Sequence, residues 1–142
     1  MRALLDVNVL IALHDADHVL HARAGEWFDS HSQSGWASTP LTQNGCLRIM
    51  SQTAYSNPQP MNLLVQMLQN STAAPWHALW PDDISILDSR QFLHTHIHSS
   101  KQLTDLYLLG LAVRNQGRLV TFDQRIPLSA VHGATPEHLV VL

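Results

Sequence analysis

The chain has 142 residues, about the length of one ordinary domain, and we expect a single domain over residues 1–142. Apolar residues make up 45% of the sequence and charged residues 13%, which indicates a folded core and excludes an intrinsically disordered chain. The formal net charge of −3 disfavours a protein that holds nucleic acid through basic charge alone. No apolar run approaches the roughly 18 residues of a membrane span, and the lone Cys46 excludes an internal disulfide framework, so we expect a cytoplasmic protein.

The first half of the sequence alternates short apolar runs with helical patterns. Thr39 followed by Pro40 is typical of a helix start, because Thr caps the first turn and Pro fits the first helical position. The expected elements, in chain order, are a strand at Arg2–Leu5, a helix starting at Val7, a helix within His18–His31, a strand at Trp36–Ser38 and a helix from Pro40 to about Ser51.

The second half continues the same alternation. The expected elements are a helix at Met61–Leu68, a strand at Trp76–Trp80, a mostly helical segment at Ile84–His98, a helix at Asp105–Asn115 capped by Thr104, and strands at Arg118–Phe122 and Leu139–Leu142. Strands that alternate with helices predict an α/β sandwich around a mostly parallel sheet.

Polar side chains follow the predicted strands at the points where the strands end. Asp6 follows the first strand, Asp123 follows the strand at Arg118–Phe122, and Asp105 lies at the start of its helix. The carboxyl ends of parallel strands share one edge of a sheet, which is where such folds bind ligands. Carboxylates held close together repel unless a cation lies between them, and Mg²⁺ prefers oxygen ligands. The sequence therefore predicts an acidic cleft that binds a divalent metal.

Five segments carry a resemblance to a known family. They are Leu4–Leu10 (LLDVNVL), Trp36–Gly45 (WASTPLTQNG), Trp80–Asp83 (WPDD), Thr104–Leu108 (TDLYL) and Thr121–Asp123 (TFD). In this order and spacing they resemble the PIN domain, and more narrowly the VapC-type toxin ribonucleases of VapBC toxin–antitoxin modules.

The resemblance implies a three-layer α/β/α fold and an endoribonuclease that depends on Mg²⁺ or Mn²⁺. It also implies a homodimer and a small cognate antitoxin that inhibits the RNA-cleaving site. Residues carried over from the family motifs are the catalytic quartet Asp6, Gln43, Asp105 and Asp123, of which the three Asp bind the metal, and the supporting polar groups Asn8 and Thr121. Arg48 and Lys101 are candidates for contacts with RNA phosphates.

Three alternatives remain open at this point. The family has Glu where this sequence has Gln43, so the chain is alternatively a catalytically weakened or inactive binding protein with the same fold. The alternating His94, His96 and His98 suggest a zinc hydrolase, although no His-Glu-x-x-His pattern accompanies them. Finally, Asp6 after a strand is a possible nucleophile of a phosphoryl-transfer enzyme.

Overall fold

The computed structural model describes all residues from Met1 to Leu142. Its centre is one five-stranded sheet with the order β3-β2-β1-β4-β5, in which every neighbouring pair is parallel. The strands are β1 (Ala3–Leu5), β2 (Trp36–Ser38), β3 (His77–Leu79), β4 (Arg118–Thr121) and β5 (Leu139–Val141). The predicted parallel sheet is therefore confirmed.

Five α-helices surround the sheet. They are α1 (Val7–His14), α2 (His21–His31), α3 (Pro40–Met50), α4 (Met61–Thr72) and α5 (Leu103–Arg114). The cap predicted for α3 is present, because the Thr39 hydroxyl accepts a hydrogen bond of 3.1 Å from the Thr42 amide, with Pro40 at the first helical position. None of the helices combines the length and apolar character that crossing a bilayer requires.

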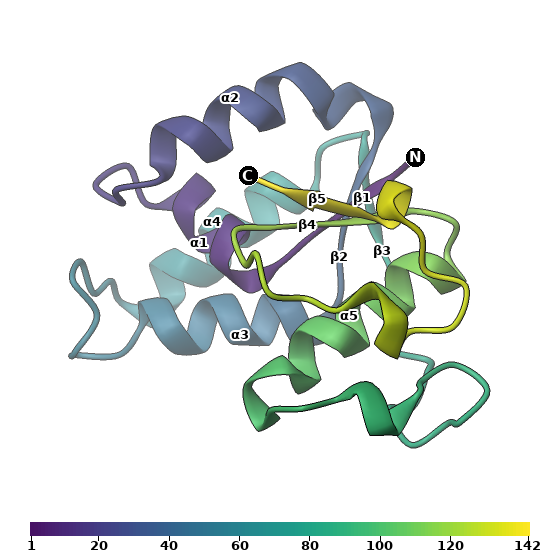
Figure 1. The fold of residues 1–142 in the computed structure, drawn as a ribbon. Helices are drawn as coiled ribbons and strands as arrows, with labels where there is room; N and C mark the ends of the chain where they lie inside the picture. Colours follow the sequence, from purple (N-terminus) through teal and green to yellow (C-terminus); the bar gives the residue numbers. More distant parts are fainter.

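The helices lie on both faces of the sheet, as Figure 1 shows. Side chains of a strand alternate between faces, so Ala3 and Leu5 pack into one core and Leu4 into the other. The first core contains residues of α1, α2, α3 and α4, whereas the second is built on α5 and the loops beside it. This arrangement is the expected three-layer α/β/α sandwich.

Two local predictions are wrong. The segment Ile84–His98 is not mostly helical, because it forms turns and a single 3-10 turn at His94–His96. Phe92 is fully buried there and forms a bridge with the loop at Val131, so tertiary packing overrides the local pattern. Thr104 is not the cap of α5, since the helix begins at Leu103, directly after a 3-10 turn at Ser100–Gln102, and Gln102 occupies the cap position.

Candidate active site

The strand order reverses beside β1, since the chain passes outward through β2 and β3 and then returns to β4 on the other side. A parallel sheet leaves a crevice at the carboxyl ends of the strands where the order reverses. Asp6 directly follows β1 and Thr121 ends β4, and these two strands are neighbours. The fold therefore places both residues at the crevice.

Asp6 is held in one orientation by two hydrogen bonds. The Val7 amide donates to Oδ1 at 2.7 Å, so the carboxylate also caps α1, and the Thr121 hydroxyl donates to Oδ2 at 2.6 Å. Asp6 is only 4% exposed, and burial raises the pKa of its carboxyl, against the two hydrogen bonds that lower it. The hydrogen bonds orient the carboxylate and favour its charged form.

Thr121 connects Asp6 to the other polar residues predicted at this edge. Its hydroxyl oxygen accepts hydrogen bonds from the Asp123 amide at 3.1 Å and from Asn8 Nδ2 at 3.4 Å. The Asp123 carboxylate in turn accepts from the Arg125 amide at 2.8 Å. Asn8, Thr121 and Asp123 are thus brought together beside Asp6.

Asp105 lies in the first turn of α5 and is half-buried. Burial, the nearby negative charges of Asp6 and Asp123 and a hydrogen bond with Asp123 together raise the pKa of its carboxyl to about 7, and burial contributes most. Three carboxyl groups that are distant in the sequence therefore interact electrostatically in the fold. Such repulsion is what a bound cation relieves.

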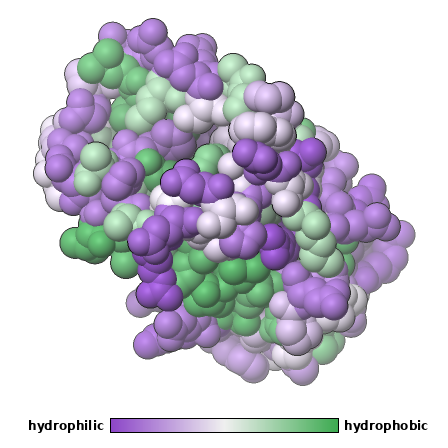
Figure 2. Space-filling view, turned by 90° about the horizontal axis from the view of Figure 1, so that it is seen from above, coloured by the Kyte–Doolittle hydropathy of each residue, from purple (hydrophilic) through white to green (hydrophobic).

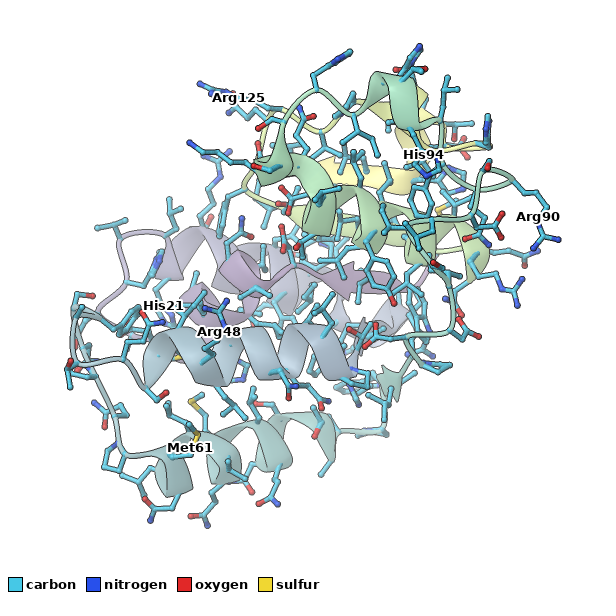
Figure 3. All side chains as sticks on the ribbon, turned by 90° about the horizontal axis from the view of Figure 1, so that it is seen from below. His21, Arg48, Met61, Arg90, His94 and Arg125 are labelled. Atoms are coloured by element: carbon cyan, nitrogen blue, oxygen red, sulfur yellow. The ribbon has the colours of Figure 1, made fainter.

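Asp6 and Asp105 line the same cleft, which has a volume of about 350 Å³. Arg48 of α3 lines it too, and Figure 3 shows Arg48 on α3 and Arg125 on the far side of the space between α3 and α5. Lys101 is exposed in the turn before α5 and is not part of the cleft wall. The remaining lining residues are Val7, Asn8, Ile11, Leu41, Gly45, Ile49 and Thr104.

The structure does not bring Gln43 into this cleft. Its Nε2 donates to Ser38 Oγ at 3.0 Å, and its side chain lines a separate cavity between α3 and α4. On a helix, position 43 is about 200° from position 41, whereas 41, 45 and 48 share one face. The structure therefore places the Gln43 side chain away from Asp6 and Asp105, and its part in catalysis stays a prediction.

Sequence reasoning missed Leu41, Gly45 and Ile49 as walls of the cleft. The sequence did contain an indication of them, because Leu41 and Gly45 lie at helical spacing from Arg48 and Ile49 is adjacent to it, which places all of them near one face of α3. Close packing explains why position 45 is a glycine, because a Cβ there would lie 2.8 Å from a methyl group of Val7. This glycine lets α3 approach α1 closely beside Asp6.

The donor set of the cleft fits a hard cation. No three His, Cys, Asp or Glu side chains are arranged to hold a metal ion by themselves. Mg²⁺ does not require such a cage, since it is commonly bound by one or two carboxylates together with waters and substrate phosphate oxygens. Asp6 and Asp105, with raised pKa values and a shared cleft, supply those two carboxylates.

Two of the open alternatives lose their support. Both carboxylate oxygens of Asp6 accept hydrogen bonds and the residue is almost fully buried, which disfavours a role as a nucleophile. The three histidines form no metal site. Instead, His94 Nε2 bonds the Ile86 carbonyl at 2.7 Å and His96 Nδ1 bonds Ser129 Oγ at 3.0 Å, so both stabilise local loop structure.

Comparison with known proteins identifies the family and agrees with the fold. The model of the PIN domain family matches residues 3–131. Ribonuclease VapC44 of Mycobacterium tuberculosis is 50% identical over 142 residues, all of both chains, and Ribonuclease VapC39 of the same organism is 40% identical over 94% of this chain and 96% of its own.

Two solved structures share the fold. The toxin VapC20 of Mycobacterium tuberculosis has a TM-score of 0.62 at 9% identity and covers 82% of this chain and 85% of its own. VapBC2 of Rickettsia felis, solved with a DNA fragment, has a TM-score of 0.61 at 14% identity and covers 89% and 94%. The resemblance seen in the sequence is thus confirmed, and the chain belongs to the PIN domain family and, within it, to the VapC ribonucleases.

Proposed function

We propose that this chain is an endoribonuclease, the toxin of a toxin–antitoxin pair, which hydrolyses RNA phosphodiester bonds in the acidic cleft with the help of Mg²⁺ or Mn²⁺. The observation that carries the proposal is the shared cleft of Asp6 and Asp105, in which repulsion and burial raise the pKa of Asp105 to about 7. The full-length relatives named as ribonucleases support RNA as the substrate.

The charged residues and Thr121 have the following proposed roles. Asp6 and Asp105 hold the metal, which supplies an activated water and neutralises phosphate charge when it is bound. Asp123 orients the attacking water, and Thr121 fixes the Asp6 carboxylate through its hydroxyl. Arg48, on the wall of the cleft, contacts a phosphate of the RNA. Lys101, outside the wall, is a candidate for a more distant phosphate.

The test is cleavage of a randomised pool of short single-stranded RNAs with Mg²⁺, with Mn²⁺ and with EDTA. We expect cleavage with either metal and none with EDTA. Asp6→Asn and Asp105→Asn should each lower the rate by about 100-fold or more, since the metal loses a ligand. Asp29→Asn, which changes an exposed acid of α2, is the matched control and should cleave normally. Cleavage that survives EDTA or both cleft variants would overturn the proposal.

We also propose that a small antitoxin inhibits the enzyme by inserting an Arg side chain into the acidic cleft. The planar guanidinium group matches paired carboxylates and would replace the metal charge. Co-expression with the product of the adjacent gene should give a stable complex that neither binds Mn²⁺ nor cleaves RNA. A complex that retains full cleavage would contradict this role. We propose a cytoplasmic location, because the proposed RNA substrate and antitoxin partner are found there.

A homodimer is the expected assembly. Figure 2 shows apolar side chains gathered in one area of the face seen from above, and such an area on a protein surface often marks a contact with another chain. A second copy of the chain would cover it in a symmetric contact. Light scattering on the purified protein should give twice the chain mass of 15.9 kDa, whereas a single chain mass would refute the dimer.

A further inference from the structure

We infer that a second cavity beside the acidic cleft binds one unpaired nucleobase of the RNA, next to the phosphate that is cleaved. The inference rests on the proposed ribonuclease function and adds a specificity site to it. The cavity has a volume of about 320 Å³ and is lined by Leu41, Asp82, Ile86, Leu103, Thr104 and Tyr107.

The cavity adjoins the proposed catalytic cleft. Leu41 and Thr104 line both spaces, and Thr104 directly precedes Asp105 in α5. A group bound in the cavity is therefore a neighbour of a group bound at Asp105. For an RNA chain, whose phosphate lies at the acids, the neighbouring group is the base or sugar of an adjacent nucleotide.

The walls of the cavity are apolar and open to solvent. Leu41 is 39% exposed and Leu103 is 43% exposed, so two large apolar side chains of this cavity are open to solvent. The Tyr107 ring lies beside them in the lining. A flat ring stacked between aliphatic and aromatic side chains is how proteins commonly hold an unpaired base.

One end of the cavity is polar and fixed. Asp82 Oδ2 accepts a hydrogen bond of 2.9 Å from the Leu41 amide, and Oδ1 accepts one of 3.1 Å from the Tyr107 hydroxyl. These bonds tie the loop after β3 to both α3 and α5, so the cavity is formed before any ligand binds and little order must be created on binding.

The chemistry of this end favours a base over other occupants. A carboxylate repels a phosphate, so the cavity does not suit the RNA backbone. A purely aliphatic side chain of a protein partner would desolvate Asp82 and offer it no donor. A nucleobase has an apolar face for Leu103 and Tyr107 and N–H donors on its edge for the carboxylate. We therefore assign the cavity to a base with a donor edge.

The experiment combines changes in the RNA with changes in the protein. The probe is a short single-stranded RNA that the wild-type protein cleaves, selected from a randomised pool, together with versions that lack one base at each position around the cleavage site. The protein variants are Leu103→Ser and the control Leu63→Ser, which alters a similarly exposed leucine on α4 (50% exposed).

We expect removal of one particular base to raise KM by about 5- to 100-fold in the wild type and in Leu63→Ser, with kcat changed little. In Leu103→Ser the intact RNA should already show a raised KM, and removal of the same base should then have little further effect. If Leu103 had only a structural role, removal of the base would still raise KM in Leu103→Ser as much as it does in the wild type.

The alternatives give different results. The base site would be refuted if removal of the base raised KM equally in wild type and Leu103→Ser, or if removal of no base raised KM. Either result would leave the ribonuclease function intact. Normal cleavage of every RNA by Leu103→Ser with loss of inhibition by the antitoxin would assign the cavity to the protein partner instead. A wild-type protein that cleaves no RNA would overturn the proposed function and this inference with it.

Discussion

Asp105→Asn should stabilise the metal-free protein at neutral pH while it abolishes cleavage. In the folded chain, burial and the charges of Asp6 and Asp123 raise the pKa of the Asp105 carboxyl from its ordinary 3.8 to about 7. The folded state therefore holds this proton more tightly than the unfolded state between those two pH values. By linkage, the free energy of unfolding falls as the pH rises through this window.

The size of the effect follows from the shift. A rise from 3.8 to about 7 is about three pH units, equivalent to roughly 4 kcal/mol at 1.36 kcal/mol per unit. Asp105 is only half-buried, so solvent screens much of this repulsion, and we expect about 1–2 kcal/mol. Asn has nearly the same shape as Asp and carries no charge, so the variant should lack this cost.

The assay is thermal unfolding of wild type and Asp105→Asn in EDTA, from about pH 4 to about pH 8. The two proteins should melt alike near the acidic end, and near pH 8 the variant should melt roughly 3–6 °C higher. Added Mg²⁺ should raise the melting temperature of the wild type and leave that of the variant nearly unchanged. A variant that is equally or less stable than wild type near pH 8 would refute the proposed clustering of charge.

Four further substitutions test other parts of the structure. Leu41→Glu adds a carboxylate to the cleft wall and should tighten Mn²⁺ binding by about ten-fold in calorimetry. Gln43→Glu should leave the Mn²⁺ affinity unchanged, because position 43 lines a different cavity. If Gln43→Glu tightens Mn²⁺ binding and Leu41→Glu does not, Gln43 faces the metal. Thr121→Val removes the hydroxyl that bonds Asp6 and should weaken Mn²⁺ binding by about 10- to 100-fold, while equal affinity would show that this hydrogen bond does not support the site. Gly110→Ala places a Cβ 2.6 Å from a buried phenylalanine ring and should cost about 1–2 kcal/mol in urea unfolding; an unchanged midpoint would show that the core adjusts.

The strands and most helices could be predicted because local and tertiary preferences agree there. Thr39–Pro40 shows this for α3, where a capping side chain and a fixed backbone angle both favour a helix start. Ile84–His98 shows the opposite case. Its apolar residues resemble a helical pattern, but burial of Phe92 against the loop at Val131 determines its path. Contacts between distant segments are not visible in a local pattern.

The acidic residues of the cleft could be predicted for a similar reason. A carboxylate directly after a parallel strand lies at the carboxyl edge of the sheet, so Asp6 and Asp123 are expected at the same edge. Gln43 could not be placed in this way, because its direction depends on how α3 rotates about its own axis. That rotation is set by packing, including the close approach of Gly45 to Val7. A motif fixes a position in the chain but not the direction of its side chain.

We propose that Asp6 and Asp105 together bind one divalent metal, and a Mn²⁺-soaked crystal is the direct test. Anomalous diffraction should show one strong Mn²⁺ peak in the acidic cleft, roughly 2.0–2.3 Å from a carboxylate oxygen of each residue. The same soak of Asp105→Asn should show a much weaker peak or none. A peak at some other place in the wild type, or no peak while Asp6 and Asp105 keep the positions described above, would contradict the account.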